Sequence, residues 1–178
     1  MSEAMRRKLT NGHAFVALGA NLPFGEEHPV ETLRRAMAAL IPLSQHLPIL
    51  SGIYESEPKD CPPGSPLYLN AVVAILPKAD EEPLSLLHKL QAIEKKFGRD
   101  RSGVINEART LDLDLLAFGK IEMDTAELTL PHPRGHERRF VLQPWLEIAG
   151  DEWLLKGRTL SDWLFDCTDP PLQRLEEY

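Results

Sequence analysis

The sequence predicts an α+β fold of the ferredoxin-like βαββαβ type, an antiparallel sheet with helices packed on one face and helical additions at the C-terminus. Two observations support this fold class. Apolar, strand-like segments and amphipathic, helix-like segments follow one another in the order strand, helix, strand, strand, helix, strand. The chain has 178 residues, of which 43% are hydrophobic, so it is long enough for one domain with a substantial core.

Each element has its own signal. The first helix has Pro29 in its first turn, where the missing N–H costs nothing. The second helix carries Leu87, Leu90 and Ile93 on one stripe and ends at Gly98, which favours a helix cap. The expected core elements are strand 13–20, helix 29–41, strand 47–58, strand 67–77, helix 83–98 and strand 110–118. Beyond them we expect a short strand pair at 121–123 and 128–130, and helices at 139–149 and 160–165.

We expect one domain over residues 1–178, with its core at about 13–149 and an extension at 150–178. The net charge of −7 gives no basic footprint for nucleic acid or an anionic membrane. No apolar run reaches the roughly 20 residues of a membrane span, and the N-terminus lacks the apolar core of a signal peptide. Cys61 and Cys167 lack metal-binding spacing, and we expect them to be reduced in a cytoplasmic monomer.

The segment TLDLDLLAF places two carboxylates inside an apolar strand. Because side chains alternate along a strand, Asp112 and Asp114 share one face and the leucines share the other, with the two carboxylates about 7 Å apart. A solvated polar face is the simple interpretation. The alternative is a site for Mg²⁺-bound polyphosphate, since magnesium takes one or two carboxylates and completes its shell with water and phosphate. We expect the leucine face to meet the helices and the aspartate face to be open or covered by loops.

Two groups of arginines accompany these aspartates. Arg99, Arg101 and Arg109 lie in the loop before the strand, where they could be a solvated charged loop or could close over phosphates. The segment LPHPRGHERRFVL carries His132 and Arg138 before an expected helix. A lone histidine is usually structural, but a helix N-terminus with nearby arginines favours an anion, so phosphate contact is the preferred interpretation here.

A third group could hold a flat heterocycle. Tyr68 and Asn70 are two residues apart and share a strand face, and Phe140 follows the second arginine group. An aromatic ring can stack on a heterocycle while an amide pairs with its edge. From the residues alone, however, a core position for Phe140 and a half-buried one for Tyr68 are the more common situation.

Six segments together are similar to those of a known enzyme family. They are FVALGANL, YESEP, YLNAVVAI, IEKKFGRDR, RTLDLDLLAFG and LPHPRGHERRFVLQPWLEIA. In this order and spacing, the chain from about Phe15 to Ala149 resembles 6-hydroxymethyl-7,8-dihydropterin pyrophosphokinase, an enzyme of folate biosynthesis. The resemblance implies transfer of the β,γ-pyrophosphoryl unit of ATP to the pterin hydroxymethyl group, giving AMP and the pterin diphosphate, with two Mg²⁺ ions.

The resemblance also implies a role for each matching residue. The catalytic set would be Arg99, Arg109, Asp112 and Asp114, with both aspartates binding Mg²⁺. The ATP-binding set would be Gln91, Glu94, Arg101, Thr129, His132 and Arg138. The pterin-binding set would be Ser56, Glu57, Tyr68, Asn70 and Phe140, while Gly19 and Asn21 match the family's first turn. In residues 105–108 (INEA) the chain departs from the tryptophan and Gly-Pro that many members carry.

Two other functions stay open from the sequence alone. One is a ligand-binding regulatory module on the same fold, because fold does not fix function. A regulatory module without catalysis would have no reason to keep both aspartates and the arginines. The other is a related kinase that acts on a different heterocycle or transfers a single phosphoryl group, which would leave ADP in place of AMP.

Overall fold

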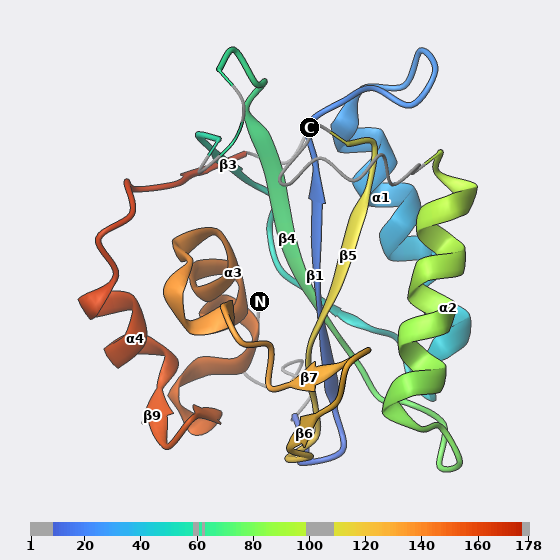
Figure 1. Ribbon diagram of the computed structural model, residues 1–178, viewed down its shortest axis with the longest axis vertical. Coiled ribbons are helices and arrows are strands. Elements are labelled where there is room, and N and C mark those ends of the chain that lie inside the picture. The colour runs from blue at the N-terminus through green and yellow to red at the C-terminus, as the bar shows by residue number, and fades with distance from the viewer. Residues whose placement is uncertain (1–8, 59–60, 62, 99–108, 176–178) are drawn as a thin grey trace.

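The computed structural model describes residues 9–58, 61, 63–98 and 109–175, and Figure 1 shows a central sheet with helices on both sides. The main sheet has six strands in the order β10-β3-β4-β1-β5, with β2 also paired to β4. Its strands are β1 (Ala14–Ala20), β2 (Ile49–Leu50), β3 (Tyr54–Ser56), β4 (Tyr68–Ile75), β5 (Asp112–Phe118) and β10 (Gln173–Arg174). Two hairpins add β6 (Met123–Asp124), β7 (Thr129–Leu130), β8 (Leu154–Leu155) and β9 (Arg158–Thr159). The helices are α1 (Pro29–Ala39), α2 (Pro83–Lys96), α3 (Arg139–Ala149) and α4 (Leu160–Asp166). Short 3₁₀ turns span Ile41–Leu43, Gly135–Glu137 and Gly150–Glu152.

The expected βαββαβ order is confirmed, and α1 and α2 pack together on one face of the sheet (Figure 1). That face holds the larger core, in which Leu33 of α1 and Leu90 of α2 meet Val16 of β1 and Leu113 of β5, all buried. The leucine face of β5 therefore meets the helices, as its alternation predicts. Gly98 has a φ of +80° directly after α2, the left-handed conformation that ends a helix.

The opposite face is covered by α3 at one end, so the expectation that it would be open or covered only by loops is wrong there. The alternation that places Asp112 and Asp114 on this face also places Leu116 there, where it joins a second core around Phe15 and Trp145. A β-bulge adds one more residue to this face: Val16 pairs with Leu115 while Phe15 pairs with Ala117, which leaves Leu116 without a partner in the ladder and brings Ala117 into the second core as well.

The expected strand at 47–58 is broken into β2 and β3, and the expected helix at 29–41 ends at Ala39. Ser51 lies at the break, where its hydroxyl donates to the carbonyl of Gly52 (2.7 Å) and accepts from the N–H of Val72 (2.9 Å). The earlier helix end follows from Pro42, which has no N–H to donate to the carbonyl of Ala38, so the chain passes from α1 into the 3₁₀ turn Ile41–Leu43. In the described ranges, no helix is long and apolar enough to cross a membrane.

We expect Phe15→Leu to lower the free energy of unfolding by about 2 kcal/mol, because the ring packs on both Trp145 and Trp153. Its centroid lies 5.3 Å from that of Trp145 and 4.7 Å from that of Trp153. Urea unfolding followed by tryptophan fluorescence measures the loss. A change below about 0.5 kcal/mol would show that this second core contributes little stability.

Candidate active site

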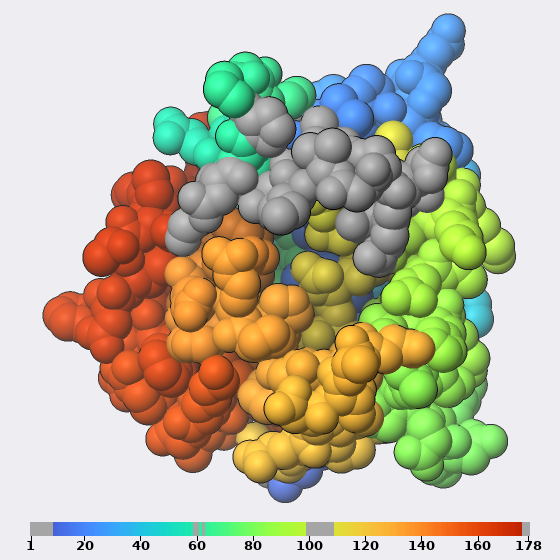
Figure 2. Space-filling view, in the orientation of Figure 1, coloured from blue at the N-terminus to red at the C-terminus, as the bar shows by residue number. Residues whose placement is uncertain are grey.

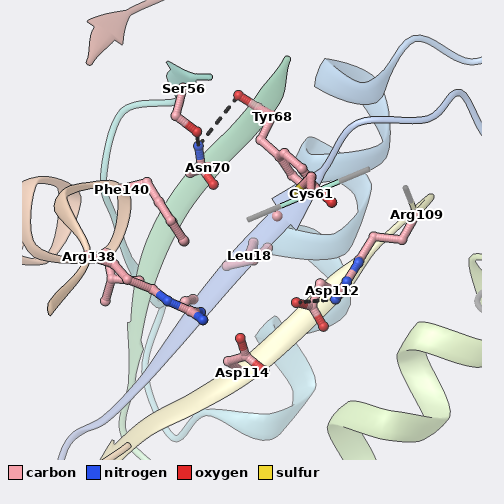
Figure 3. A pocket seen from close by; sticks show the side chains of 13 residues that line it. Leu18, Ser56, Cys61, Tyr68, Asn70, Arg109, Asp112, Asp114, Arg138 and Phe140 are labelled. Atoms are coloured by element: carbon pink, nitrogen blue, oxygen red, sulfur yellow. Dashed lines mark hydrogen bonds and ion pairs between the residues drawn. The ribbon is translucent and has the colours of Figure 1, made fainter. Parts of the chain in front are cut away.

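One pocket opens on the face of the sheet that α3 only partly covers, with an empty volume of about 710 Å³ that includes its open mouth. Figure 2 shows this hollow between α3 and α2, with β5 at its base, and Figure 3 shows the side chains around it. The lining residues are Ala17, Leu18, Gly19, Ser56, Cys61, Tyr68, Asn70, Arg109, Asp112, Asp114, Arg138, Phe140 and Val141. Eight predicted site residues therefore meet in one cavity, although they come from four separate parts of the chain.

Small residues of β1 make the cavity possible. Ala17 lies opposite Asp114 and Gly19 lies opposite Asp112 in the β1–β5 register. On the other side of β1, Gly19 pairs with Asn70 of β4. Phe15 lies two residues before Ala17 on the same face of β1, and its ring packs into the second core. The decrease in side-chain size from Phe15 to Ala17 and Gly19 therefore marks where the core ends and the pocket begins.

Asp112 and Arg109 form an ion pair at the pocket edge. The Arg109 guanidinium donates to the Asp112 carboxylate at 3.0 Å, and the two side chains are only 15% and 22% exposed. The backbone of Arg109 is fixed by Asn21, whose side-chain oxygen accepts the Arg109 N–H at 2.8 Å. The backbone N–H groups of Asn21 and Leu22 in turn donate to the Arg109 carbonyl, both at 3.1 Å. Asn21 thus anchors the start of β5 to the turn after β1.

Arg138 brings a second positive charge to the opposite wall. Figure 3 shows its guanidinium pointing into the pocket toward Asp114. Burial lowers the pKa of Arg138, and repulsion from Arg134 lowers it further, while Asp114 and Asp112 act in the other direction. Its guanidinium carbon also lies 5.5 Å from the centre of the Phe140 ring. The pocket therefore places two carboxylates between two guanidinium groups.

The other end of the pocket is suited to a flat polar ring. The Asn70 amide nitrogen donates to the Ser56 hydroxyl at 2.8 Å and to the Tyr54 carbonyl at 3.2 Å. Figure 3 shows the amide oxygen directed to the cavity between Tyr68 and Phe140. Burial raises the pKa of Tyr68, with further increases from Cys61 and Asp112, so its phenol is uncharged at neutral pH. This end of the pocket therefore offers two aromatic rings, those of Tyr68 and Phe140, and one oriented hydrogen-bond acceptor, the Asn70 amide oxygen.

The remaining predicted residues lie elsewhere. Glu57 lines a neighbouring hollow with Arg139 and Asp169, which shares Ser56 and Phe140 with the main pocket. Arg99 and Arg101, together with the altered segment 105–108, lie outside the described residues. The residues that do not line the pocket are Gln91, half-buried on α2; Glu94, buried on α2; Thr129, half-buried on β7; and His132, half-buried after β7.

Glu94 has a contact that the sequence did not indicate. Its carboxylate accepts the backbone N–H of Leu113 at 3.2 Å, and its side chain is only 2% exposed. β5 is an edge strand, so this N–H has no partner strand on that side. Glu94 therefore fixes the strand segment between Asp112 and Asp114.

The sequence interpretation missed Cys61, Val141 and the small residues of β1 as pocket residues. The falling residue size in Phe15, Ala17 and Gly19 was an available signal. No comparable pattern marks Cys61, which reaches the cavity from an irregular loop.

His132 is held neutral. Burial lowers its pKa to about 4, and the charges of Arg138 and Arg134 contribute, against an opposing effect of Asp112. Its Nδ1 accepts the backbone N–H of Arg134 at 3.1 Å, so the remaining proton belongs on Nε2. The imidazole can therefore act as an uncharged donor through Nε2.

This pKa predicts a loss of stability in acid. In the unfolded chain His132 binds a proton near its ordinary pKa of 6.5, whereas in the folded chain it does so only near pH 4. As pH falls from about 6.5 to about 4, the unfolded state therefore gains the proton first and the free energy of unfolding decreases. NMR titration of the His132 ring in metal-free protein should give a midpoint near 4, and the acid loss of stability should shrink in His132→Gln. A midpoint above 6 would contradict the buried, neutral histidine.

Comparison with known proteins places these features in a family. The model of the 7,8-dihydro-6-hydroxymethylpterin-pyrophosphokinase (HPPK) family matches residues 15–150. The 2-amino-4-hydroxy-6-hydroxymethyldihydropteridine pyrophosphokinase of Haemophilus influenzae is 39% identical over 163 residues, which cover 91% of this chain and 97% of that protein. The protein of the same name from Pseudomonas aeruginosa is 38% identical over 162 residues, covering 90% and 95%.

Solved structures agree at the level of the fold. The wild-type HPPK-DHPS of Plasmodium falciparum, solved with pteroate, superposes with a TM-score of 0.64 at 13% identity. The match covers 86% of this chain and 44% of that one, so the present chain spans less than half of that larger protein. The sequence match over most of the chain, with the same fold and the paired aspartates in one pocket, shows that the chain belongs to the 7,8-dihydro-6-hydroxymethylpterin-pyrophosphokinase family.

Proposed function

We propose that this protein transfers the β,γ-pyrophosphoryl unit of ATP to the hydroxymethyl group of 6-hydroxymethyl-7,8-dihydropterin, giving AMP and the pterin diphosphate for folate biosynthesis. One observation carries the proposal beyond family membership: Asp112 and Asp114 share a pocket with Asn70 and two aromatic rings. The aspartates that would bind the phosphates and metal, and the residues that would bind the pterin ring, thus line adjoining parts of one pocket. The hydroxymethyl oxygen would form a bond to the β-phosphorus, the bond from that phosphorus to the AMP oxygen would break, and the hydroxyl proton would pass to water.

Tyr68 and Phe140 would flank the pterin ring, while the Asn70 amide oxygen accepts an N–H from its edge. The orientation of that amide supports this role, because its nitrogen donates hydrogen bonds to the Ser56 hydroxyl and the Tyr54 carbonyl and its oxygen is left toward the cavity. Ser56 therefore acts on the pterin through Asn70, and Glu57 would contribute from the neighbouring hollow that shares Phe140.

The two aspartates fit magnesium. They are the same-face carboxylates of β5, they line an open pocket, and the described residues contain no group of three or more ligand side chains. Such a pair suits Mg²⁺, which takes one or two carboxylates and fills its shell with water and substrate phosphate oxygens. When bound, two such ions would neutralise phosphate charge and lower the pKa of the attacking hydroxyl. Arg109 would share the Asp112 carboxylate with a metal ion, since the ion pair uses one carboxylate oxygen.

The arginines would stabilise the charge that moves during transfer. Arg109 and Arg138 face the cavity from opposite walls. We extend this role to Arg99 for transfer and to Arg101 for ATP phosphates on the strength of the family pattern. His132 would donate from Nε2 to a phosphate oxygen, and Gln91 and Thr129 would line the nucleotide side. Glu94 would act on the nucleotide indirectly, through the backbone of Leu113 between the two aspartates.

The test incubates purified protein with ATP, Mg²⁺ and 6-hydroxymethyl-7,8-dihydropterin and separates the nucleotides by chromatography. We expect AMP in equal amount to the pterin consumed, and no nucleotide turnover without pterin. ADP would contradict pyrophosphoryl transfer and favour a single phosphoryl transfer. ATP binding without turnover of any tested pterin would favour a regulatory module.

We also propose that the chain works as one domain and as a cytoplasmic monomer. Both core clusters share the central sheet, which supports a single domain from the first strand to β10. Both cysteines are free thiols, which fits a reducing compartment. Sedimentation equilibrium at micromolar concentration should return the 20.1 kDa mass of one chain, and a mass of twice that value would contradict the monomer.

A further inference from the structure

We infer that Glu147 and the C-terminal strand β10 act as positioning elements for pterin recognition, because together they fix β3, the strand that orients the Asn70 amide. The inference rests on the proposed function and assigns a role to the part of the chain after residue 150. Neither Glu147 nor β10 lines the pocket, so both would act on the pterin indirectly, and β3 is the strand that both of them contact.

Glu147 on α3 connects two segments that are far apart in the sequence, residues 52–54 and β10. Its carboxylate accepts the Tyr54 hydroxyl at 2.6 Å and the backbone N–H of Gly52 at 3.1 Å. The same carboxylate accepts the Arg174 guanidinium at 3.0 Å. One side chain on α3 thus ties the approach to β3, β3 itself and β10 together. Tyr54 is 5% exposed, so its hydroxyl bond lies at the border of the core.

β10 completes the outer edge of β3. Arg174 pairs with Tyr54 and Gln173 pairs with Glu55, and the N–H of Leu175 donates to the Ile53 carbonyl at 2.8 Å. Without β10, the three-residue strand β3 would be held in the sheet only through β4. Gly52 also leaves room for the Arg174 side chain, since an added Cβ would lie 2.5 Å from its Nε. A side chain at position 52 would therefore displace the Arg174 guanidinium from this place.

β3 carries the groups that orient Asn70. The Tyr54 carbonyl and the Ser56 hydroxyl both accept from the Asn70 amide nitrogen, at 3.2 and 2.8 Å. These two acceptors keep the nitrogen away from the cavity and the oxygen toward it (Figure 3). If β3 shifts, both acceptors shift with it, and the amide loses its fixed orientation. A loosened β3 should therefore weaken pterin binding and leave the aspartate and arginine end of the pocket unchanged.

The experiment compares Glu147→Ala and Tyr54→Phe with the wild-type full chain. We expect KM for the pterin, and Kd for 6-hydroxymethylpterin by calorimetry, to rise about fivefold in Glu147→Ala and less in Tyr54→Phe, with KM for ATP unchanged. Glu147→Gln, which keeps acceptor capacity, should recover part of the loss. Asp166→Ala is the matched control, because it breaks the Arg158–Asp166 pair (2.7 Å) in the same C-terminal region without touching β3.

Two results would overturn the inference. One is an unchanged pterin KM and Kd in Glu147→Ala. The other is an equal weakening of both substrates, or an equal weakening in Asp166→Ala, since either would mean general loss of structure. A merely smaller folded fraction would lower kcat without moving KM or Kd. Failure of the proposed function would look different: the wild-type chain itself would bind no pterin and release no AMP, which would remove the basis of the inference as well.

Discussion

Asp112→Asn and Asp114→Asn should each lower kcat by on the order of 10³-fold while the chain stays folded. Asparagine keeps the size of the side chain but removes the charge that Mg²⁺ and the surrounding guanidinium groups require. Both aspartates are partly exposed at the pocket, so the amide that replaces either carboxylate still reaches solvent. Single-turnover kinetics at saturating ATP and pterin, repeated over a range of Mg²⁺ concentrations, measure the effect.

The matched control for these variants is Asp80→Asn. Asp80 is an exposed aspartate in the turn before α2, outside the pocket. It should keep wild-type turnover. Near wild-type kcat in Asp112→Asn or Asp114→Asn would show that the metal-binding role assigned to that aspartate is wrong.

Asn70→Leu should lower kcat/KM for the pterin by at least about 10²-fold, with little change in the binding of ATP. The substitution removes the acceptor at the pterin edge and leaves the Ser56 hydroxyl and Tyr54 carbonyl without their donor. Asn70 is 4% exposed, so part of any loss will come from lower stability. Steady-state kinetics with each substrate varied separately distinguish recognition of the pterin from a loss of folded protein.

Ser44→Ala provides the comparison. Ser44 is also buried and accepts the N–H of Leu76 at 3.0 Å, just past the far end of β4. Ser44→Ala should lower the free energy of unfolding by an amount similar to that of Asn70→Leu, without altering KM for either substrate. If Asn70→Leu behaved in the same way, or weakened ATP as much as pterin, the assignment of Asn70 to the pterin edge would be contradicted.

Alternation along β5 was sufficient to predict the central arrangement of this molecule. Leu113 and Leu115 reach the helices and Asp112 and Asp114 reach the pocket, because a strand has a period of two whatever surrounds it. The helix caps were predictable for the same local reason, as Pro29 and Gly98 show. The expected grouping of Tyr68, Asn70 and Phe140 needed the family resemblance, since their residue types alone favoured a structural role.

Features that depend on contacts distant in sequence were not predictable. The second core, in which α3 packs on the sheet around Trp145, and the bulge that adds Ala117 to it have no local pattern in the sequence. The break at Gly52 depends on Glu147 and Arg174, which lie 95 residues away or further along the chain. β10 is only two residues long, and its pairing with β3 becomes visible only once the sheet is assembled.

The central claim is that the β- and γ-phosphoryl groups leave ATP together, and ATP labelled with ³²P at the β-phosphorus tests it directly. The account predicts that the label moves from ATP into the pterin product, at the rate at which unlabelled AMP appears, and that Asp114→Asn slows this transfer on the order of 10³-fold. Label that remains in the nucleotide as ADP while the pterin is phosphorylated would contradict pyrophosphoryl transfer.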